Sequence, residues 1–123
     1  MAYKILVVDD EDSVRRAIRR ILESDNYEVA EAGNGLEALE WVRRSLPDLI
    51  LLDLNMPKMG GLEFLQAARK INANLAVIML TASVDEQEAA KTMELGASDY
   101  ITKPVDVDYL LSSVQAKLAL QGG

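Results

Sequence analysis

The sequence predicts an α/β fold in which a parallel sheet is covered by helices on both faces. Short aliphatic runs alternate five times with longer segments whose apolar residues recur at helical spacing, a pattern typical of strands joined by crossover helices. The aliphatic runs do not alternate with polar residues, which indicates strands buried on both faces. Because such crossovers are right-handed, two helices should cover one face of the sheet and three the other, which gives a three-layer sandwich.

Each expected strand is a short apolar run, and each expected helix has an apolar stripe. The strands are expected at residues 3–8, 27–32, 49–52, 75–80 and 100–102. The first helix follows a predicted N-cap at Asp12, and the others are expected at about 34–45, 60–71, 85–95 and 106–120, with Asn34 capping the second and Gly96 closing the fourth. The side chains expected to face inward are Val14, Ile18, Ile21, Leu22, Leu39, Val42, Leu62, Leu65, Ala68, Ile71, Ala89, Ala90, Met93, Leu95, Leu110, Leu111, Val114 and Leu118.

Length and composition limit the possible classes of protein. The 123 residues fit one domain, with a core over residues 3–120 and a frayed tail at 121–123. The net charge of −7 argues against direct binding of nucleic acid. The apolar runs are too short to cross a membrane, and no signal-peptide pattern opens the chain, so we expect a cytoplasmic location without membrane insertion. Cysteine and histidine are absent, so any metal must be held by oxygen ligands.

Polar residues follow four of the five expected strands. Asp9 and Asp10 follow the first strand, Asp53 the third, Thr81 the fourth and Lys103 the fifth. Because the carboxyl ends of parallel strands meet at one edge of a sheet, these residues should converge there. Five polar groups at four strand ends are hard to explain by helix capping alone.

The chemistry of these residues indicates a phosphoryl-accepting site. Three carboxylates about 5 Å apart would repel one another by roughly 3 kcal/mol per pair at an effective dielectric constant near 20. A hard divalent cation with oxygen ligands would relieve that repulsion. A carboxylate nucleophile (Asp53), a metal, a hydroxyl (Thr81) and an ammonium (Lys103) together suit the formation of an acyl phosphate.

Four motifs then resemble the receiver domain of two-component response regulators. They are VVDDE at residues 7–11, LLDLNMP at 51–57 followed by GG at 60–61, LTA at 80–82 and YITKP at 100–104. Each motif is weak alone, but four in this order and spacing are highly specific, and the resemblance covers residues 3–120. It implies a flavodoxin-like (βα)5 fold with strand order 2-1-3-4-5. It also implies a phosphoacceptor switch, CheY-like in fold and supplied by a sensor histidine kinase or a histidine phosphotransfer protein.

The resemblance also implies a role for each matched residue. Asp53 should be the phosphoacceptor, and Mg²⁺, for which Mn²⁺ can substitute, should be bound by Asp10 directly, by Asp9 through water, by Asp53, and by the backbone carbonyl of Asn55. A protein of this family would catalyse only its own phosphorylation and autodephosphorylation and would not be a turnover enzyme.

Further implied roles concern the loops after the last two strands. Thr81 and Tyr100 match the family's switch pair, and Lys103 should contact the phosphate. Asn55 and Ser83 occupy positions that tune autodephosphorylation in the family. Pro104 should follow a cis peptide bond. The resemblance also implies a downstream effector or output domain, and because the sequence ends soon after the fifth helix, we expect no output domain within these residues.

Three alternative functions differ in what their sites require. A haloacid-dehalogenase-like phosphatase also uses a nucleophilic aspartate and Mg²⁺, but needs a second acid where Asn55 stands. A flavodoxin needs a phosphate-binding loop after the first strand, where the acids at residues 9–12 would repel phosphate. A pseudo-receiver, an interaction module that works without phosphorylation, remains the alternative, although the complete set of site residues argues against it.

Several surface features keep two interpretations. Arg15, Arg16, Arg19 and Arg20 in the first helix either form a solvated face, paired as Glu11–Arg15, Asp12–Arg16 and Arg19–Glu23, or form a docking site for the phosphoryl donor. The small apolar face of the fourth helix either fits the sheet or makes the helix loosely anchored. Residues 85–108 carry seven acids against Lys91 and Lys103, which disfavours a charge-paired dimer on this surface and favours a basic partner. Trp41 is expected to be a packing residue at the margin of the second helix, and Met56 and Met59 are expected to line the site loop without a chemical role.

Overall fold

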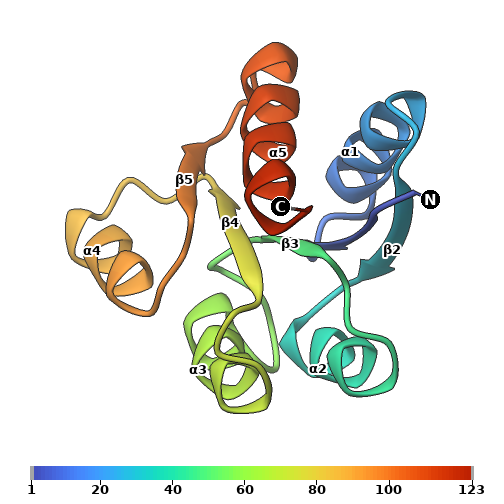
Figure 1. The fold of residues 1–123 in the computed structure, drawn as a ribbon. Helices are drawn as coiled ribbons and strands as arrows, with labels where there is room; N and C mark the ends of the chain where they lie inside the picture. Colours follow the sequence, from blue (N-terminus) through green and yellow to red (C-terminus); the bar gives the residue numbers. More distant parts are fainter. Residues whose placement is uncertain (1, 123) are drawn as a thin grey trace.

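The computed structural model describes residues 2–122, in which five strands and five helices alternate along the chain (Figure 1). The strands are β1 (Lys4–Val8), β2 (Glu28–Ala32), β3 (Leu49–Leu52), β4 (Ala76–Thr81) and β5 (Asp99–Thr102). The helices are α1 (Asp12–Ser24), α2 (Gly35–Arg44), α3 (Gly61–Ile71), α4 (Glu86–Glu94) and α5 (Val107–Gly122). All ten expected elements are present, and their bounds lie close to the predicted ones.

The strands form a single parallel sheet in the order β2-β1-β3-β4-β5. This order is the flavodoxin-like arrangement that the sequence motifs implied. In the register, Val8 of β1 pairs with Ala32 of β2 and with Leu52 of β3. The ends of these three strands therefore lie level at one edge of the sheet, which is where the chain leaves β1 and β3 for the polar residues.

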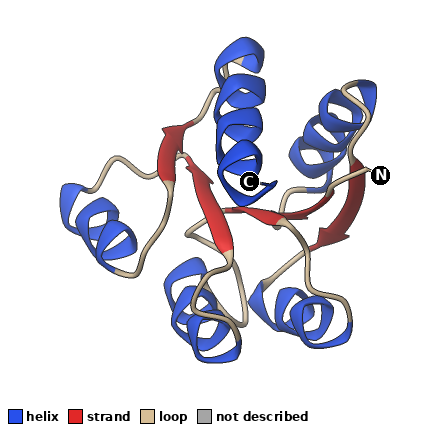
Figure 2. Ribbon diagram, viewed as in Figure 1, coloured by secondary structure: helices blue, strands red, loops and turns tan. Residues whose placement is uncertain are grey.

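Helices cover both faces of the sheet, so the three-layer prediction is confirmed. Helices α1 and α5 lie on one face, and α2, α3 and α4 lie on the other (Figures 1 and 2). Successive side chains of a strand point to opposite faces, and the core accordingly divides in two. Leu6 and Val8 of β1 pack in the cluster under α2 and α3, whereas Ile5 and Val7 pack in the cluster under α1 and α5.

Several local predictions are confirmed. The side chain of Asn34 caps α2 by accepting a hydrogen bond from the Glu37 amide at 3.0 Å. Gly96 follows the end of α4 with a φ of +87°, a conformation that L-residues with side chains rarely adopt. The peptide bond between Lys103 and Pro104 is cis.

Other local predictions are wrong, mainly at helix ends. Asp12 is not the N-cap of α1 but its first residue, and Glu11 holds the cap position. Ile71 is 43% exposed because it is the last residue of α3, beyond the inward contact at Ala68. Met93 of α4 is 47% exposed. Helix α5 is assigned to Gly122 and Gly123 lies outside the described residues, so the frayed tail at 121–123 stays a prediction.

Candidate functional site

The polar residues predicted to converge do lie at the carboxyl edge of the sheet. Asp9 and Asp53 directly follow β1 and β3, Thr81 is the last residue of β4, and Lys103 directly follows β5. The backbone ties these positions together, because the Asp53 amide donates to the Val8 carbonyl at 3.0 Å and the Lys103 amide donates to the Thr81 carbonyl at 2.9 Å. The side chains are therefore carried by the ends of hydrogen-bonded strands.

Three carboxylates form a tight cluster at this edge. Asp9, Asp10 and Asp53 each offer a carboxylate oxygen, and these atoms lie within 4.8 Å of one another. Asp9 and Asp53 are 2% and 6% exposed, whereas Asp10 is exposed. Water screens the two buried charges poorly, so their mutual repulsion is a real cost to the folded protein. The cluster fits a hard divalent cation because all of its donors are oxygen atoms.

Lys103 supplies the positive charge nearest to this cluster in the described chain. Its Nζ atom lies 2.5 Å from Asp9 Oδ2 and 3.4 Å from Asp53 Oδ2. Burial alone would lower the pKa of Lys103, but the hydrogen bond to Asp9 and the charges of Asp53 and Asp9 outweigh it and raise the pKa above its usual value. Lys103 is therefore charged at neutral pH, and one ammonium facing three carboxylates leaves the site net negative.

Thr81 is linked to α4 and to Tyr100 through one residue, Ser83. Thr81 is completely buried, and its hydroxyl accepts a hydrogen bond from the Ser83 amide at 3.2 Å. The Ser83 hydroxyl donates to Glu88 of α4 at 2.8 Å, and the Ser83 carbonyl accepts from the Tyr100 hydroxyl at 3.1 Å. The predicted switch pair is thus connected through the β4–α4 loop.

The loop after Asp53 folds back on its own strand at Gly61. The Gly61 amide donates to the Leu54 carbonyl at 2.8 Å, and a Cβ at Gly61 would lie 2.3 Å from the Asp53 carbonyl oxygen. No residue with a side chain fits there without a backbone shift. Within this loop Asn55 is exposed, so its role as a backbone ligand stays a prediction. Met56 and Met59, which were expected to line this loop, are partly buried and pack against the core.

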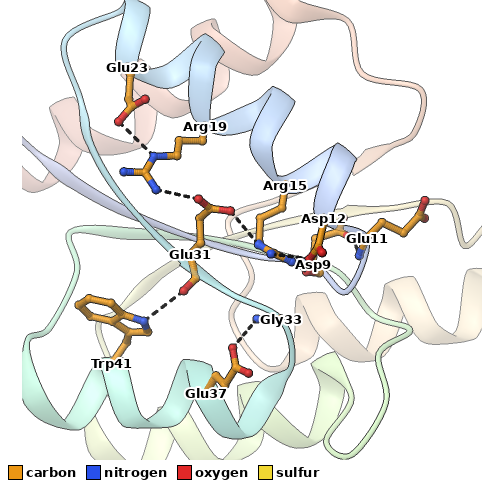
Figure 3. Close-up of polar contacts among 10 residues, drawn as sticks. All are labelled: Asp9, Glu11, Asp12, Arg15, Arg19, Glu23, Glu31, Gly33, Glu37 and Trp41. Carbon is orange, nitrogen blue, oxygen red and sulfur yellow. Dashed lines mark hydrogen bonds and ion pairs between the residues drawn. The ribbon is translucent and has the colours of Figure 1, made fainter.

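Sequence reasoning missed an arginine network on the other side of the cluster (Figure 3). Of the three ion pairs expected along the first helix, only Arg19–Glu23 forms. Arg15 instead contacts Asp12 at 2.6 Å, Glu31 of β2 at 2.8 Å and the carbonyl of Asp9 at 2.7 Å. Arg19 also contacts Glu31, at 2.7 Å. The sequence held one signal for this network: Glu31 lies in a predicted strand, and the arginine-bearing first helix must pack against the sheet that contains it.

The comparisons with known proteins agree with this geometry. The family model for the response regulator receiver domain matches residues 5–115. The chain belongs to this family. Sporulation initiation phosphotransferase F of Bacillus subtilis is 36% identical over 121 residues, which are 98% of each protein. Response regulator MprA of Mycobacterium leprae is 39% identical over 115 residues, which are 94% of this chain and 50% of MprA, so this receiver domain spans about half of that relative.

Solved structures resemble the receiver domain along nearly its whole length. A CheY-like response regulator receiver domain protein from Methanospirillum hungatei superposes with a TM-score of 0.95 at 32% identity, covering 99% of this chain and 98% of the other. Chemotaxis protein CheY4 of Vibrio cholerae gives a TM-score of 0.89 at 32% identity, covering 94% and 98%. The fold and the membership in two-component signalling therefore rest on sequence and structure together.

Receiver domains of this family are signalling phosphoacceptors rather than turnover enzymes. Here the acidic cluster of Asp9, Asp10 and Asp53 provides a place where a metal could bind. None of the helices between residues 2 and 122 is both long enough and apolar enough to cross a membrane.

Proposed function

We propose that this receiver domain is a phosphorylation-dependent switch in which Asp53 accepts a phosphoryl group from a phosphohistidine of another protein. The single observation that carries the proposal is the placement of Asp53. Its carboxylate is buried at the end of a core strand, beside two further acids and 3.4 Å from a charged lysine. A nucleophile in a fixed position next to cationic groups is what phosphoryl transfer requires.

The transfer would proceed by a simple exchange of bonds. An oxygen of the Asp53 carboxylate forms the bond to phosphorus as the phosphorus–nitrogen bond of the donor breaks, and the electron pair of that bond stays on the imidazole nitrogen. Lys103 lies within reach of both buried carboxylates and would move its charge to a phosphoryl oxygen. These 123 residues contain no histidine, so a phosphohistidine donor must lie outside them. The family membership favours a histidine kinase or a histidine phosphotransfer protein as that donor. In autodephosphorylation, water replaces the Asp53 carboxylate on phosphorus and inorganic phosphate leaves.

A divalent cation belongs to this proposal. Asp9, Asp10, Asp53 and the Asn55 backbone carbonyl would hold Mg²⁺ or Mn²⁺, with Asp9 acting largely through water. When bound, the cation supplies the positive charge that the phosphoryl oxygens and the three carboxylates together demand.

The phosphoacceptor role is tested by mass spectrometry. The protein is incubated with Mg²⁺ and a small acyl phosphate, and we expect the mass of one added phosphoryl group on Asp53. Asp53→Asn and addition of a chelator should each abolish the product, whereas Asp108→Asn, which removes an exposed acid of α5, should not. An unmodified wild-type protein under these conditions would contradict the proposal and favour the pseudo-receiver.

The conformational response would pass through Thr81. A phosphoryl group on Asp53 would draw the Thr81 hydroxyl toward it and away from the Ser83 amide, and Tyr100 would turn inward behind it. Glu88 and Tyr100 both depend on Ser83, so α4 would loosen or shift. Hydrogen exchange with and without beryllofluoride and Mg²⁺ tests this step. We expect changed protection in α4 and unchanged protection in α1, and equal protection of α4 in both states would reject it.

The effector is expected to present a basic surface. Asp85, Glu86, Glu94, Asp106 and Asp108 are exposed along α4, α5 and the adjoining loops. Val84, Val107 and Tyr109 are exposed among them, by 82%, 43% and 51%, and offer apolar contact area within the acidic surface. Such a surface fits a partner with lysine or arginine around an apolar centre. The receiver domain itself would bind neither nucleic acid nor membrane, its residues 3–120 would form one domain, and it would act in the cytoplasm.

A further inference from the structure

Arg15 is a partly buried cation whose three guanidinium nitrogens are all engaged. Only 13% of its side chain is exposed. Nε donates to Glu31, Nη2 donates to Asp12, and Nη1 donates to the backbone carbonyl of Asp9 (Figure 3). The guanidinium is a rigid planar fork. Because two carboxylates hold two of its nitrogens, the direction of the third, toward Asp9, is fixed.

The carbonyl that Arg15 contacts belongs to the peptide that joins Asp9 and Asp10, two of the three acids of the β1–α1 loop. The Asp9 amide continues the sheet by donating to the Ala32 carbonyl at 3.1 Å. Strand β2 then ends at Ala32, and the ladder between β1 and β2 stops. The Asp9 carbonyl takes its donor from Arg15 instead of from the neighbouring strand, at 2.7 Å.

The other polar atoms of Asp9 are also engaged. Its Oδ1 atom accepts from the Glu11 amide at 2.9 Å, and its Oδ2 atom accepts from Lys103 at 2.5 Å. Asp10, in contrast, is exposed. The direction in which Asp10 presents its carboxylate therefore depends on the peptide plane that precedes it, and Arg15 is the side chain that holds this plane.

Glu31 keeps Arg15 in place from the outer strand. It accepts from Arg15 Nε and from Arg19 Nη1, and its side chain is only 21% exposed. Arg19 is 41% exposed and also pairs with Glu23. Arg19 and Glu31 thus form a support behind Arg15, which alone reaches the loop that carries the acids.

We propose that Arg15 is a positioning residue for the divalent cation, because its guanidinium fixes the peptide between Asp9 and Asp10 and so sets the direction of the Asp10 carboxylate. The inference rests on the proposed function, since it concerns the cation of the same site. It assigns the effect to the geometry of the guanidinium and not to its positive charge, which Asp12 and Glu31 already balance. A lysine at this position would keep the charge but not the fork.

The test measures Mg²⁺ affinity without any phosphoryl donor. Mg²⁺ is titrated into isotopically labelled protein, and the dissociation constant is read from amide chemical shifts. We expect about tenfold weaker binding in Arg15→Gln and nearly as great a loss in Arg15→Lys, the size seen when residues behind metal ligands are changed. Glu31→Gln should weaken binding in the same direction by less. Arg20→Gln, which removes an exposed arginine of the same helix, should bind as the wild type does.

A second readout separates positioning from general damage to the fold. At saturating Mg²⁺, Arg15→Lys should be phosphorylated by a small acyl phosphate at nearly the wild-type rate, because excess cation overcomes a weakened site. A destabilised fold would not recover in this way. If Arg15→Gln fails to fold, Glu31→Gln carries the same comparison.

Defined outcomes would overturn the inference. Mg²⁺ affinity within twofold of wild type in Arg15→Gln or Glu31→Gln would do so, as would full recovery of affinity in Arg15→Lys, which would assign the effect to charge. These results leave the proposed function intact when the wild-type protein binds Mg²⁺ and is phosphorylated. A wild-type protein without a saturable response to Mg²⁺ would instead overturn the proposed function and this inference with it.

Discussion

The two sides of the site are held in different ways. On the β1 side, the amide, the carbonyl and both carboxylate oxygens of Asp9 have hydrogen-bond partners. On the β4 side, α4 buries one residue, Thr92, whose hydroxyl bonds within its own helix. The comparison indicates that Asp9 is held firmly, whereas α4 has few buried contacts to lose if it moves.

The side-chain hydrogen bonds that anchor helix α4 to its neighbours lie at its two ends rather than along its face. At its C-terminal end, Arg69 of α3 donates to the carbonyls of Leu95 and Gly96 at 2.7 and 2.9 Å, and it also donates to the carbonyl of Leu75, just before β4, at 2.5 Å. At its N-terminal end, Glu88 accepts from Ser83. The hydrogen bonds from Arg69 do not involve residues of the site, whereas the hydrogen bond from Ser83 to Glu88 depends on the loop that follows Thr81.

The largest contrast is expected between truncation of a core side chain in α3 and truncation of a side chain in α4. Phe64 of α3 is completely buried, and Phe64→Ala should lower the free energy of unfolding by about 3–5 kcal/mol. Met93→Ala in α4 should change it by less than about 0.5 kcal/mol, because Met93 is 47% exposed. Urea denaturation measures both. Similar losses from the two variants would show that α4 is packed as firmly as α3.

A second prediction concerns the strain stored among the acids. Asp53→Asn should stabilise the protein in the presence of a chelator by about 2 kcal/mol, since the two carboxylate repulsions that it removes together exceed the one attraction to Lys103 that it also removes. Urea denaturation measures the change, and Asp108→Asn should show none of it. Excess Mg²⁺ should reduce the difference between Asp53→Asn and wild type. Unchanged stability with chelator would contradict a tight carboxylate cluster.

The hydrogen bonds from Arg69 to the C-terminal end of α4 give a third prediction. Arg69→Met keeps the apolar stem but leaves three carbonyls without their donor, and we expect a loss of about 1–2 kcal/mol. Hydrogen exchange should quicken mainly in α4 and the following turn. Lys70→Met, an exposed neighbour on the same helix, serves as the control. Faster exchange spread evenly over all helices would argue that Arg69 does not stabilise α4 locally.

The smallest expected effect is a dependence of stability on pH at Glu31. The hydrogen bond from Arg19 and, beyond the opposing effect of burial, the hydrogen bond from Arg15 lower the pKa of Glu31 below its ordinary value of 4.5. A carboxylate with a lowered folded-state pKa contributes stability above its unfolded pKa and loses it as the pH falls through the folded value. Glu31→Gln should therefore lower stability at neutral pH by about 0.5–1 kcal/mol, and the difference should shrink below pH 4.5. Melting curves across this range check it, and a constant difference would exclude ionised Glu31 as the cause.

The sequence was sufficient to predict which residues meet at the carboxyl edge of the sheet, but not which side-chain contacts surround them. Aliphatic runs that end in Asp9, Asp53 or Thr81 predict their convergence, because a parallel sheet has only one carboxyl edge. The pairing of Arg15 could not be predicted in the same way. Spacing along a helix identifies Glu11 as a partner, but Glu31 on a neighbouring strand and the Asp9 carbonyl compete for the same guanidinium. Which partner is contacted depends on the helix–sheet packing.

The apolar pattern also left the ends of elements undetermined. Ile71 continues the stripe of α3 but lies past the last inward contact, at Ala68. The role of Ser83 as a connection between Thr81, Glu88 and Tyr100 depends on a loop conformation and has no periodic signal. Both cases concern places where the chain leaves regular structure.

Trp41 has a consequence for how motion in this protein can be observed. It is the only tryptophan, and its indole donates to the Glu31 carbonyl at 3.2 Å (Figure 3). Lys4 Nζ and Arg44 Cζ lie 5.4 and 5.2 Å from the centroid of its ring. The native fluorophore is thus hydrogen-bonded to Glu31, the same strand residue that pairs with Arg15, on the β1 side of the site. Intrinsic fluorescence reports on strand β2, and a dye on Met93→Cys, in a chain without other cysteines, is needed to observe α4.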